Sequence, residues 1–208
     1  MTHPRRRSPG AVLVFGESRN DSDSIATLVL SANPRLQGRV RALPRPTSLT
    51  RTAGAAAVRR WVDEIEMAIR GHEAARGPVT AVLVHRDADR ADPGETVAAT
   101  LSGQLASFAG RPVVPVQATE AWWFLFPDAV EAVRPRAWRG CMPRRQRDVE
   151  RIDRPKHELI GRTAARGGVP YTEADSPAIA RKVREQAREP HGSSVSYRRL
   201  TDLAVSLS

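Results

Sequence analysis

The chain has 208 residues, enough for one α/β domain with an appendage, and its 40% hydrophobic and 27% charged residues exclude wholesale disorder. It carries 33 basic and 23 acidic residues, which give a formal net charge of +10. A single cysteine, Cys141, excludes an internal disulfide framework and a multi-cysteine zinc site, and it favours a reducing cytoplasm.

Apolar runs and amphipathic stretches alternate along the first two thirds of the chain. The expected strands are residues 11–15, a weaker run at 40–43, 79–84 and 113–116. The expected helices are 21–30, capped by Asp21 or Ser22, then 55–75 and 95–108. This alternation is typical of a parallel sheet with helices on both faces. The apolar runs at 11–15 and 121–126 are far shorter than the roughly 20 residues that span a bilayer, so we expect a cytoplasmic protein without membrane contact.

The chain after residue 138 differs in composition and charge. We expect a flexible basic arm over 1–10, an α/β domain over 11–138 and a basic helical extension over 139–208 that packs on this domain. Its expected helices, 154–165, 176–188 and 197–207, have few apolar positions. Residues 134–166 hold eleven basic and four acidic side chains, whereas 11–133 hold thirteen and fourteen. A basic segment beside a neutral domain favours binding of phosphates by the basic segment.

Acidic residues follow two of the expected strands. Glu17 and Asp21 come after the first strand, and Asp87 and Asp89 come after the strand at 79–84. Ligands of parallel α/β sheets bind at the carboxyl ends of strands, and residues two apart in an extended segment face the same side. Clustered carboxylates repel one another unless a cation lies between them, and Mg²⁺ prefers oxygen ligands. We therefore expect metal-assisted phosphoryl chemistry at this edge.

Five segments carry a resemblance to known proteins. Residues 12–21, Val-Leu-Val-Phe-Gly-Glu-Ser-Arg-Asn-Asp, and 82–89, Val-Leu-Val-His-Arg-Asp-Ala-Asp, resemble the two signatures of the Toprim superfamily. Residues 116–128, 153–156 and 192–197 resemble a small bacterial Toprim-like family of unassigned activity, related to the Toprim domain of overcoming-lysogenisation-defect nucleases. The resemblance implies a Toprim-like, Rossmann-like fold: a mainly parallel four-stranded sheet with helices on both faces, plus a basic helical C-terminal extension.

The same resemblance implies an activity and a set of site residues. It implies an endonuclease that hydrolyses DNA or RNA phosphodiesters with Mg²⁺ or Mn²⁺, and a place in antiviral defence with a separate ATPase subunit as partner. Glu17 would act as the acid/base, and Lys156 would neutralise charge on the cleaved phosphate. The implied metal ligands are Glu17, Asp21, Asp87, Asp89 and Glu120. The arginines expected to contact the nucleic-acid backbone are Arg86, Arg144, Arg145, Arg147 and Arg154.

Two alternative functions stay open at this point. The first is a non-catalytic Toprim-fold subunit that binds nucleic acid or regulates a partner. The second is a receiver-like or flavodoxin-like signalling domain, in which acids at strand ends also hold Mg²⁺. A receiver needs a lysine after its fifth strand, and the only lysines, Lys156 and Lys182, lie late in the chain.

Several polar and aromatic side chains have more than one interpretation. His85 and Arg86 are unusually polar for the end of a central strand. Each of the two residues therefore has two interpretations, contact with a phosphate or exposure to solvent. Trp122 and Trp123 are followed directly by apolar residues and are expected in the core. Tyr171 and Tyr197 lie in polar sequence and are better candidates for stacking on bases.

Overall fold

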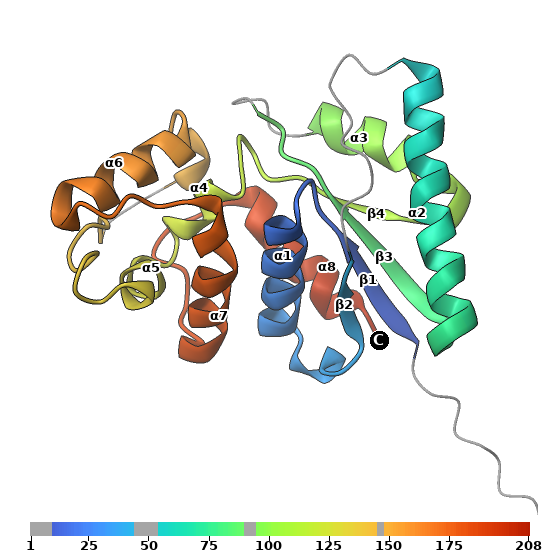
Figure 1. Ribbon diagram of the computed structural model, residues 1–208, viewed down its shortest axis with the longest axis horizontal. Coiled ribbons are helices and arrows are strands. Elements are labelled where there is room, and N and C mark those ends of the chain that lie inside the picture. Colours follow the sequence, from blue (N-terminus) through green and yellow to red (C-terminus); the bar gives the residue numbers. More distant parts are fainter. Residues whose placement is uncertain (1–9, 44–53, 90–94, 145–147) are drawn as a thin grey trace, which may run out of the picture.

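The computed structural model describes residues 10–43, 54–89, 95–144 and 148–208 and has an α/β architecture (Figure 1). The first half contains, in chain order, β1 (Ala11–Phe15), α1 (Arg19–Ala32), η1 (Pro34–Leu36), β2 (Val40–Ala42), α2 (Ala55–Arg76), β3 (Val79–His85), α3 (Glu95–Gln104), η2 (Ala106–Phe108) and β4 (Arg111–Val113). The second half is helical and contains α4 (Glu120–Trp123), α5 (Pro127–Val133), η3 (Val149–Arg151), α6 (Pro155–Gly167), η4 (Glu173–Asp175), α7 (Ser176–Gln186) and α8 (Val195–Ser206).

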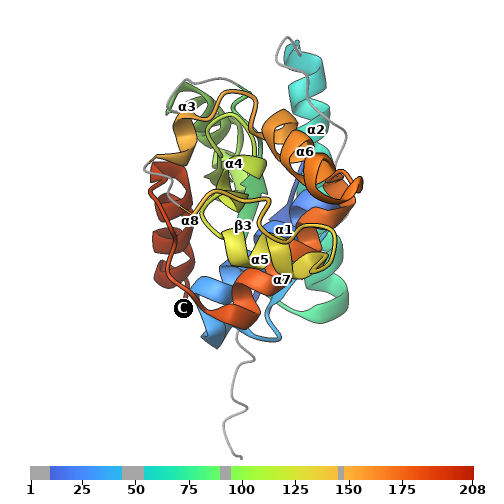
Figure 2. The same ribbon diagram turned by 90° about the vertical axis from the view of Figure 1, so that its left-hand side faces the viewer.

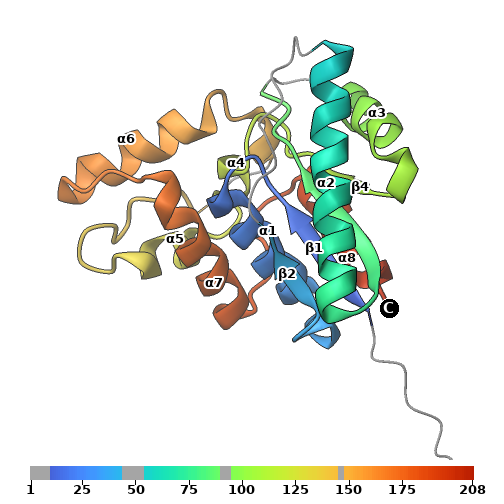
Figure 3. The same cartoon turned by 45° about the vertical axis from the view of Figure 1, so that its right-hand side comes forward.

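The described strands form one parallel sheet in the order β2-β1-β3-β4. Alternate residues of β1 face opposite sides, because successive side chains of a strand point to opposite faces. Val12 and Val14 belong to the larger hydrophobic cluster with α1, whereas Leu13 and Phe15 belong to a smaller one with Trp61 of α2. Figure 3 shows α2 against the sheet on the side opposite α1 and α7. The predicted parallel four-stranded sheet with helices on both faces is therefore confirmed.

The C-terminal helices share a core with the sheet. Ile179 of α7 and Leu200 of α8 lie in the same buried cluster as Val29 of α1. Figure 2 shows α5, α6 and α7 together on one side of the molecule. Asn33, after α1, donates from Nδ2 to the backbone oxygen atoms of Ala204 and Leu207, at 2.9 and 3.0 Å. The apolar residues of α7 and α8 are thus buried against α1.

The two tryptophans of α4 are core residues, as predicted. Trp122 and Trp123 are both fully buried. Their indole Nε1 atoms donate to the hydroxyls of Ser196 and Ser176, at 3.0 and 3.1 Å. Each buried indole N–H therefore has a partner, so α4 is fixed from two C-terminal helices.

The tyrosines proposed for base stacking lie in the interior. Tyr171 is only 2% exposed, so the stacking prediction is wrong for this residue. Tyr197 packs edge-to-face against Trp122 and Phe126, with ring centroids 5.6 and 5.3 Å apart. Polar neighbours in the sequence misled the prediction, because both rings are buried by segments distant along the chain.

Glu150 of η3 stabilises the start of α8 through hydrogen bonds. Its Oε1 accepts hydrogen bonds from Ser194 Oγ, Ser196 Oγ and the Ser196 backbone N–H, each at 2.7 Å. Ser194 Oγ in turn accepts from the backbone N–H of Tyr197 and caps α8. Burial alone raises the pKa of Glu150, but the hydrogen bonds from Ser196 and Ser194 outweigh it and lower the pKa below its usual value of 4.5.

Replacing this carboxylate should cost stability in a pH-dependent way. We expect Glu150→Gln to lower the free energy of unfolding by about 1–2 kcal/mol near neutral pH, because hydrogen bonds to a charged acceptor are stronger. The folded-state pKa lies below the unfolded value, so this stabilisation is present above the unfolded pKa and is lost as pH falls through the folded pKa. Urea unfolding of both proteins at about pH 7 and about pH 3 checks this. An equal difference at both values would contradict it.

Candidate metal centre

The sheet order brings the ends of β1 and β3 to a switch point. The chain leaves β1 toward β2 on one side and returns to β3 on the other side of β1. Ligands of open α/β sheets bind at such points, outside the carboxyl ends of the strands. Glu17 follows β1 and Asp87 follows β3, and the Asp87 backbone N–H donates to Glu17 Oε2 at 3.1 Å. The structure thus joins two acids that are 70 residues apart.

Three side chains converge here. Glu17, His85 and Asp87 each offer one ligand atom, and these atoms lie within 4.8 Å of one another. His85, the last residue of β3, has Nε2 at 3.1 Å from Asp87 Oδ1 and at 2.8 Å from Thr119 Oγ1. The Thr119 backbone N–H also donates to Asp87 Oδ1, at 3.1 Å. The segment before α4 therefore holds Asp87 against the end of β3.

The electrostatics of this group reflect burial and crowded negative charge. Burial raises the pKa of Glu17; the hydrogen bond from Asp87 lowers it, the Asp87 charge raises it, and the net shift is upward. Burial lowers the pKa of His85, but the hydrogen bond to Asp87 and the charges of Asp87, Asp21 and Glu17 outweigh it and raise the pKa to about 9. A site with this excess of carboxylates attracts cations.

Glu120 and Lys156 lie within electrostatic reach of the three converging residues. Glu120 is 6% exposed, and the Tyr171 hydroxyl donates to its Oε1 at 3.1 Å. Burial, followed by the Asp87 charge, raises the pKa of Glu120 to about 7. The hydrogen bond to Glu173 is the main cause of a raised pKa of Lys156. The negative charges of Glu120 and Asp87 raise this pKa further. Glu120 is outside the group whose ligand atoms converge, but it borders it.

Asp21 has a capping role. Its Oδ2 accepts from the backbone N–H and the hydroxyl of Ser18, at 2.9 and 2.8 Å, and Ser18 Oγ accepts from the Asp21 N–H at 3.2 Å. Ser18, and not Asp21 or Ser22 as predicted, is the N-cap residue of α1, and Asp21 completes the capping box from the third helical position. The structure does not bring Asp21 into the converging group, although its charge acts on His85.

Asp89 also lies outside the converging group. The prediction aligned it with Asp87 on the assumption of an extended backbone. Asp89 instead has φ of 55°, in the left-handed region, and its side chain is exposed. Its backbone N–H donates to Gln117 O at 2.7 Å. This backbone conformation interrupts the alternation of side chains along an extended segment, so Asp87 and Asp89 do not face the same side.

The arginines expected to contact nucleic acid are in different environments. Arg86 is half-buried beside Asp87, and Arg154 is exposed at the start of α6. Arg144 is half exposed and pairs with Asp128 and with Glu131, so its guanidinium connects α5 to the following segment. The remaining two positions, Arg145 and Arg147, lie outside the described residues.

Sequence reasoning did not assign the roles that His85 and Thr119 have. His85 is 2% exposed, so the interpretation that it faces solvent is wrong, whereas its contact with phosphate stays a prediction. The sequence did contain a signal for His85: a histidine stands at the end of an apolar strand, where a buried position normally holds an apolar side chain. Thr119 gave no signal, because only the fold brings it to Asp87.

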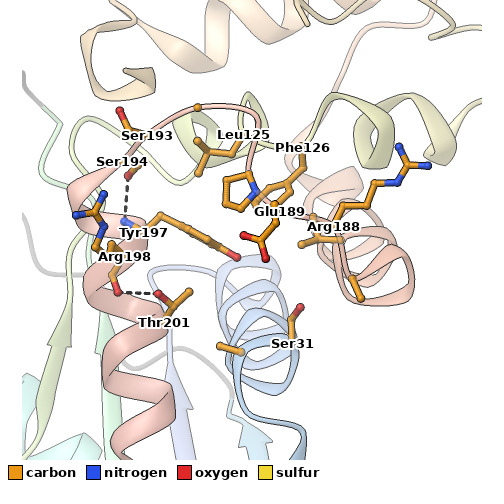
Figure 4. Close-up of a pocket in the computed structure, with 15 residues that line it drawn as sticks. Ser31, Leu125, Phe126, Arg188, Glu189, Ser193, Ser194, Tyr197, Arg198 and Thr201 are labelled. Carbon is orange, nitrogen blue, oxygen red and sulfur yellow. Dashed lines mark hydrogen bonds between the residues drawn. The ribbon is translucent and has the colours of Figure 1, made fainter. Parts of the chain in front are cut away.

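A separate pocket of about 410 Å³ lies between the end of α1, the end of α7 and the first turns of α8 (Figure 4). Leu125 and Phe126 contribute apolar lining, and Glu189 and Arg198 contribute charge. Figure 4 shows the Tyr197 hydroxyl pointing toward Glu189. Burial and the Glu189 charge raise the pKa of Tyr197 to about 12. None of the residues lining this pocket belongs to the acidic site.

Comparison of the chain with known protein families, with curated proteins and with solved structures found no match. The fold and site therefore define a class only: a Rossmann-like α/β protein with a parallel sheet and a candidate metal centre at its switch point. Within the described ranges, no helix is long and apolar enough to cross a membrane.

Proposed function

We propose that the protein is a nuclease that uses Mg²⁺ or Mn²⁺ to hydrolyse phosphodiester bonds. We also propose that it is related to the Toprim proteins that its motifs resemble. The observation that carries it is the meeting of Glu17 and Asp87 at the switch point of the sheet. Both residues come from the segments that resemble the Toprim signatures. Two acids from separate strands at a ligand-binding edge repel one another when ionised, and a divalent cation between them removes this repulsion.

The chemistry of the donor atoms fits such a cation. Within the described part of the chain, Glu17 Oε1 and Asp87 Oδ2 accept no hydrogen bond, since the bonds of these residues end on Oε2 and Oδ1. Carboxylate oxygens are the ligands that Mg²⁺ and Mn²⁺ prefer. A divalent cation bound there would act as a Lewis acid toward a phosphate oxygen or a water molecule.

The surrounding residues supply charge that a phosphodiester needs. Lys156 places an ammonium group near Glu120 and Asp87, where it can offset the negative charge of a phosphate. Arg86 and Arg154 add positive charge on neighbouring segments, and the chain as a whole has a net charge of +10. Such charge binds the nucleic-acid backbone without reading bases, so binding should weaken steeply with salt.

A cleavage panel tests this function. Supercoiled DNA, single-stranded DNA and total RNA are incubated with the full chain in Mg²⁺, in Mn²⁺ and in a chelator. Asp63→Asn serves as the matched control, because Asp63 is an exposed acid of α2. We expect ion-dependent products from the parent and this control. Binding without products would favour the non-catalytic subunit, and ion binding without nucleic-acid binding would favour the signalling domain.

We further propose a separate ATPase subunit as partner and a role in antiviral defence. The support for this is the resemblance to the Toprim-like family alone. Affinity purification of the chain from its native cell should retain an ATPase. Purification without any such protein would contradict the proposal.

Lys156 gives a second, independent prediction. We expect Lys156→Gln to lower kcat/KM for cleavage by roughly 10–100-fold, as loss of a preorganised charge at the reacting phosphate costs a few kcal/mol. The Mn²⁺ dissociation constant should change little, because Lys156 donates to Glu173 and is no ligand. The control is Lys182→Gln, which removes the other lysine, an exposed partner of Glu185. Cleavage by Lys156→Gln at the parent rate would remove Lys156 from the mechanism.

A further inference from the structure

We propose that His85 is a positioning residue for Asp87 and does not ligate the metal ion, so that the ion meets oxygen ligands only. This inference rests on the metal-dependent function proposed above and goes further, because the convergence of Glu17, His85 and Asp87 by itself allows His85 as a third ligand. The two roles make opposite demands on one atom, Nε2 of His85. A ligand nitrogen must have a free lone pair, whereas a positioning nitrogen must carry a proton.

The neighbours of Nε2 decide between these roles. Nε2 lies 3.1 Å from Asp87 Oδ1, a carboxylate oxygen that can only accept. An unprotonated Nε2 would direct its lone pair at this oxygen, and the two would repel. A proton on Nε2 turns the contact into a hydrogen bond. Thr119 Oγ1, at 2.8 Å from Nε2, is a second oxygen that can accept this proton.

The other ring nitrogen leads to the same conclusion. If Nε2 bound a metal ion, the ring proton would have to be on Nδ1, and metal-bound histidines almost always donate that proton to an acceptor. Nδ1 of His85 is buried and has no hydrogen-bond partner among the described residues. Ligation through Nε2 would therefore leave a buried N–H unpaired.

The group that His85 positions is the carboxylate of Asp87. Its Oδ1 accepts from the Thr119 backbone N–H at 3.1 Å and from Thr119 Oγ1 at 3.3 Å, in addition to the contact with His85. These contacts occupy Oδ1 and leave Oδ2 for a cation. Hydrogen bonds to a ligating carboxylate fix its orientation and tune its affinity. Oxygen ligands alone favour Mg²⁺ and Mn²⁺, whereas an imidazole ligand would shift the preference toward Zn²⁺ and other late metals.

Electron spin-echo spectroscopy of the Mn²⁺-loaded full chain tests this directly. A histidine nitrogen bound to Mn²⁺ gives strong ¹⁴N modulation, whereas a nitrogen one sphere further out does not. We expect the parent protein to bind Mn²⁺ without strong ¹⁴N modulation. His85→Gln, which keeps an N–H donor, should bind Mn²⁺ within a few-fold of the parent, and His85→Leu, which has no donor, should bind about 10–100-fold more weakly.

The outcomes separate this inference from the proposed function. Strong ¹⁴N modulation in the parent that disappears in His85→Gln would overturn the positioning role and leave the metal-dependent function standing. Parent-like affinity in His85→Leu would also overturn it. No Mn²⁺ binding by the parent would overturn the proposed function and this inference together. If His85→Leu fails to fold, the spectrum of the parent and the affinity of His85→Gln still decide the question.

Discussion

Asp87→Asn is expected to abolish divalent-ion binding and to lower phosphodiester cleavage by more than about 100-fold, because a Lewis-acid metal supplies several kcal/mol and each 1.4 kcal/mol is about tenfold in rate. The substitution keeps the shape of the side chain and an acceptor at Oδ1 for Thr119 and His85. It removes the charge on Oδ2, the atom left for a cation. The fold should therefore survive while the site loses its function.

Calorimetry with Mn²⁺ and the cleavage panel measure the two effects separately. The parent should also gain thermal stability with excess Mn²⁺, by about 2.7 kcal/mol at 100 times the dissociation constant, and Asp87→Asn should gain nothing. Circular dichroism without metal should be the same for both proteins. Cleavage by Asp87→Asn at the parent rate would place the catalytic centre elsewhere.

The sheet could be predicted from the sequence because its signal is local. The run at β1 is apolar throughout and the run at β3 is apolar over Ala81–Val84, as burial on both faces of a sheet requires, and both strands lie where they were expected. β4 was less well predicted: it spans Arg111–Val113, whereas the apolar run suggested 113–116. The backbone N–H groups of Arg86 and Ala88 still donate to the carbonyl oxygens of Val113 and Pro115, but Pro115 has no N–H of its own to donate, and the strand ends at Val113.

The candidate site could be predicted only in part. Glu17 and Asp87 follow strands that are adjacent in the sheet, so strand ends alone brought them together. The role of Asp21 depends on one side-chain hydroxyl, that of Ser18, and the place of Asp89 depends on one backbone dihedral angle. Neither is visible as a periodic pattern.

Composition and periodicity did not predict how the C-terminal half contributes to the site. Tyr171 donates to Glu120 across 51 residues, and the charges of Glu120 and Asp87 act on Lys156 of α6. Their positions depend on the packing of helices with few apolar residues. The resemblance implied a role for Lys156, and this role stays a prediction.

Gly16→Ala is expected to destabilise the protein, because an added methyl group would collide with the backbone of α1. A Cβ on Gly16 would lie 2.6 Å from the backbone nitrogen of Ser22 and 2.7 Å from Cβ of Asp21. These atoms belong to the first turns of α1, so relief requires a shift of the helix or of β1. Gly16 N–H also donates to Ser22 Oγ at 2.8 Å, which fixes the same close approach.

The expected cost is about 1–3 kcal/mol of unfolding free energy or more, as for other overpacked interiors, together with weaker Mn²⁺ binding because Glu17 is the next residue. Gly71→Ala is the matched control. Gly71 lies inside α2, where an added Cβ meets nothing within 4 Å, so this substitution should stabilise the protein by about 0.5–1 kcal/mol. Urea unfolding and Mn²⁺ calorimetry of both variants measure the contrast. A Gly16→Ala protein with parent stability and parent affinity would show that the turn between β1 and α1 does not set the position of Glu17.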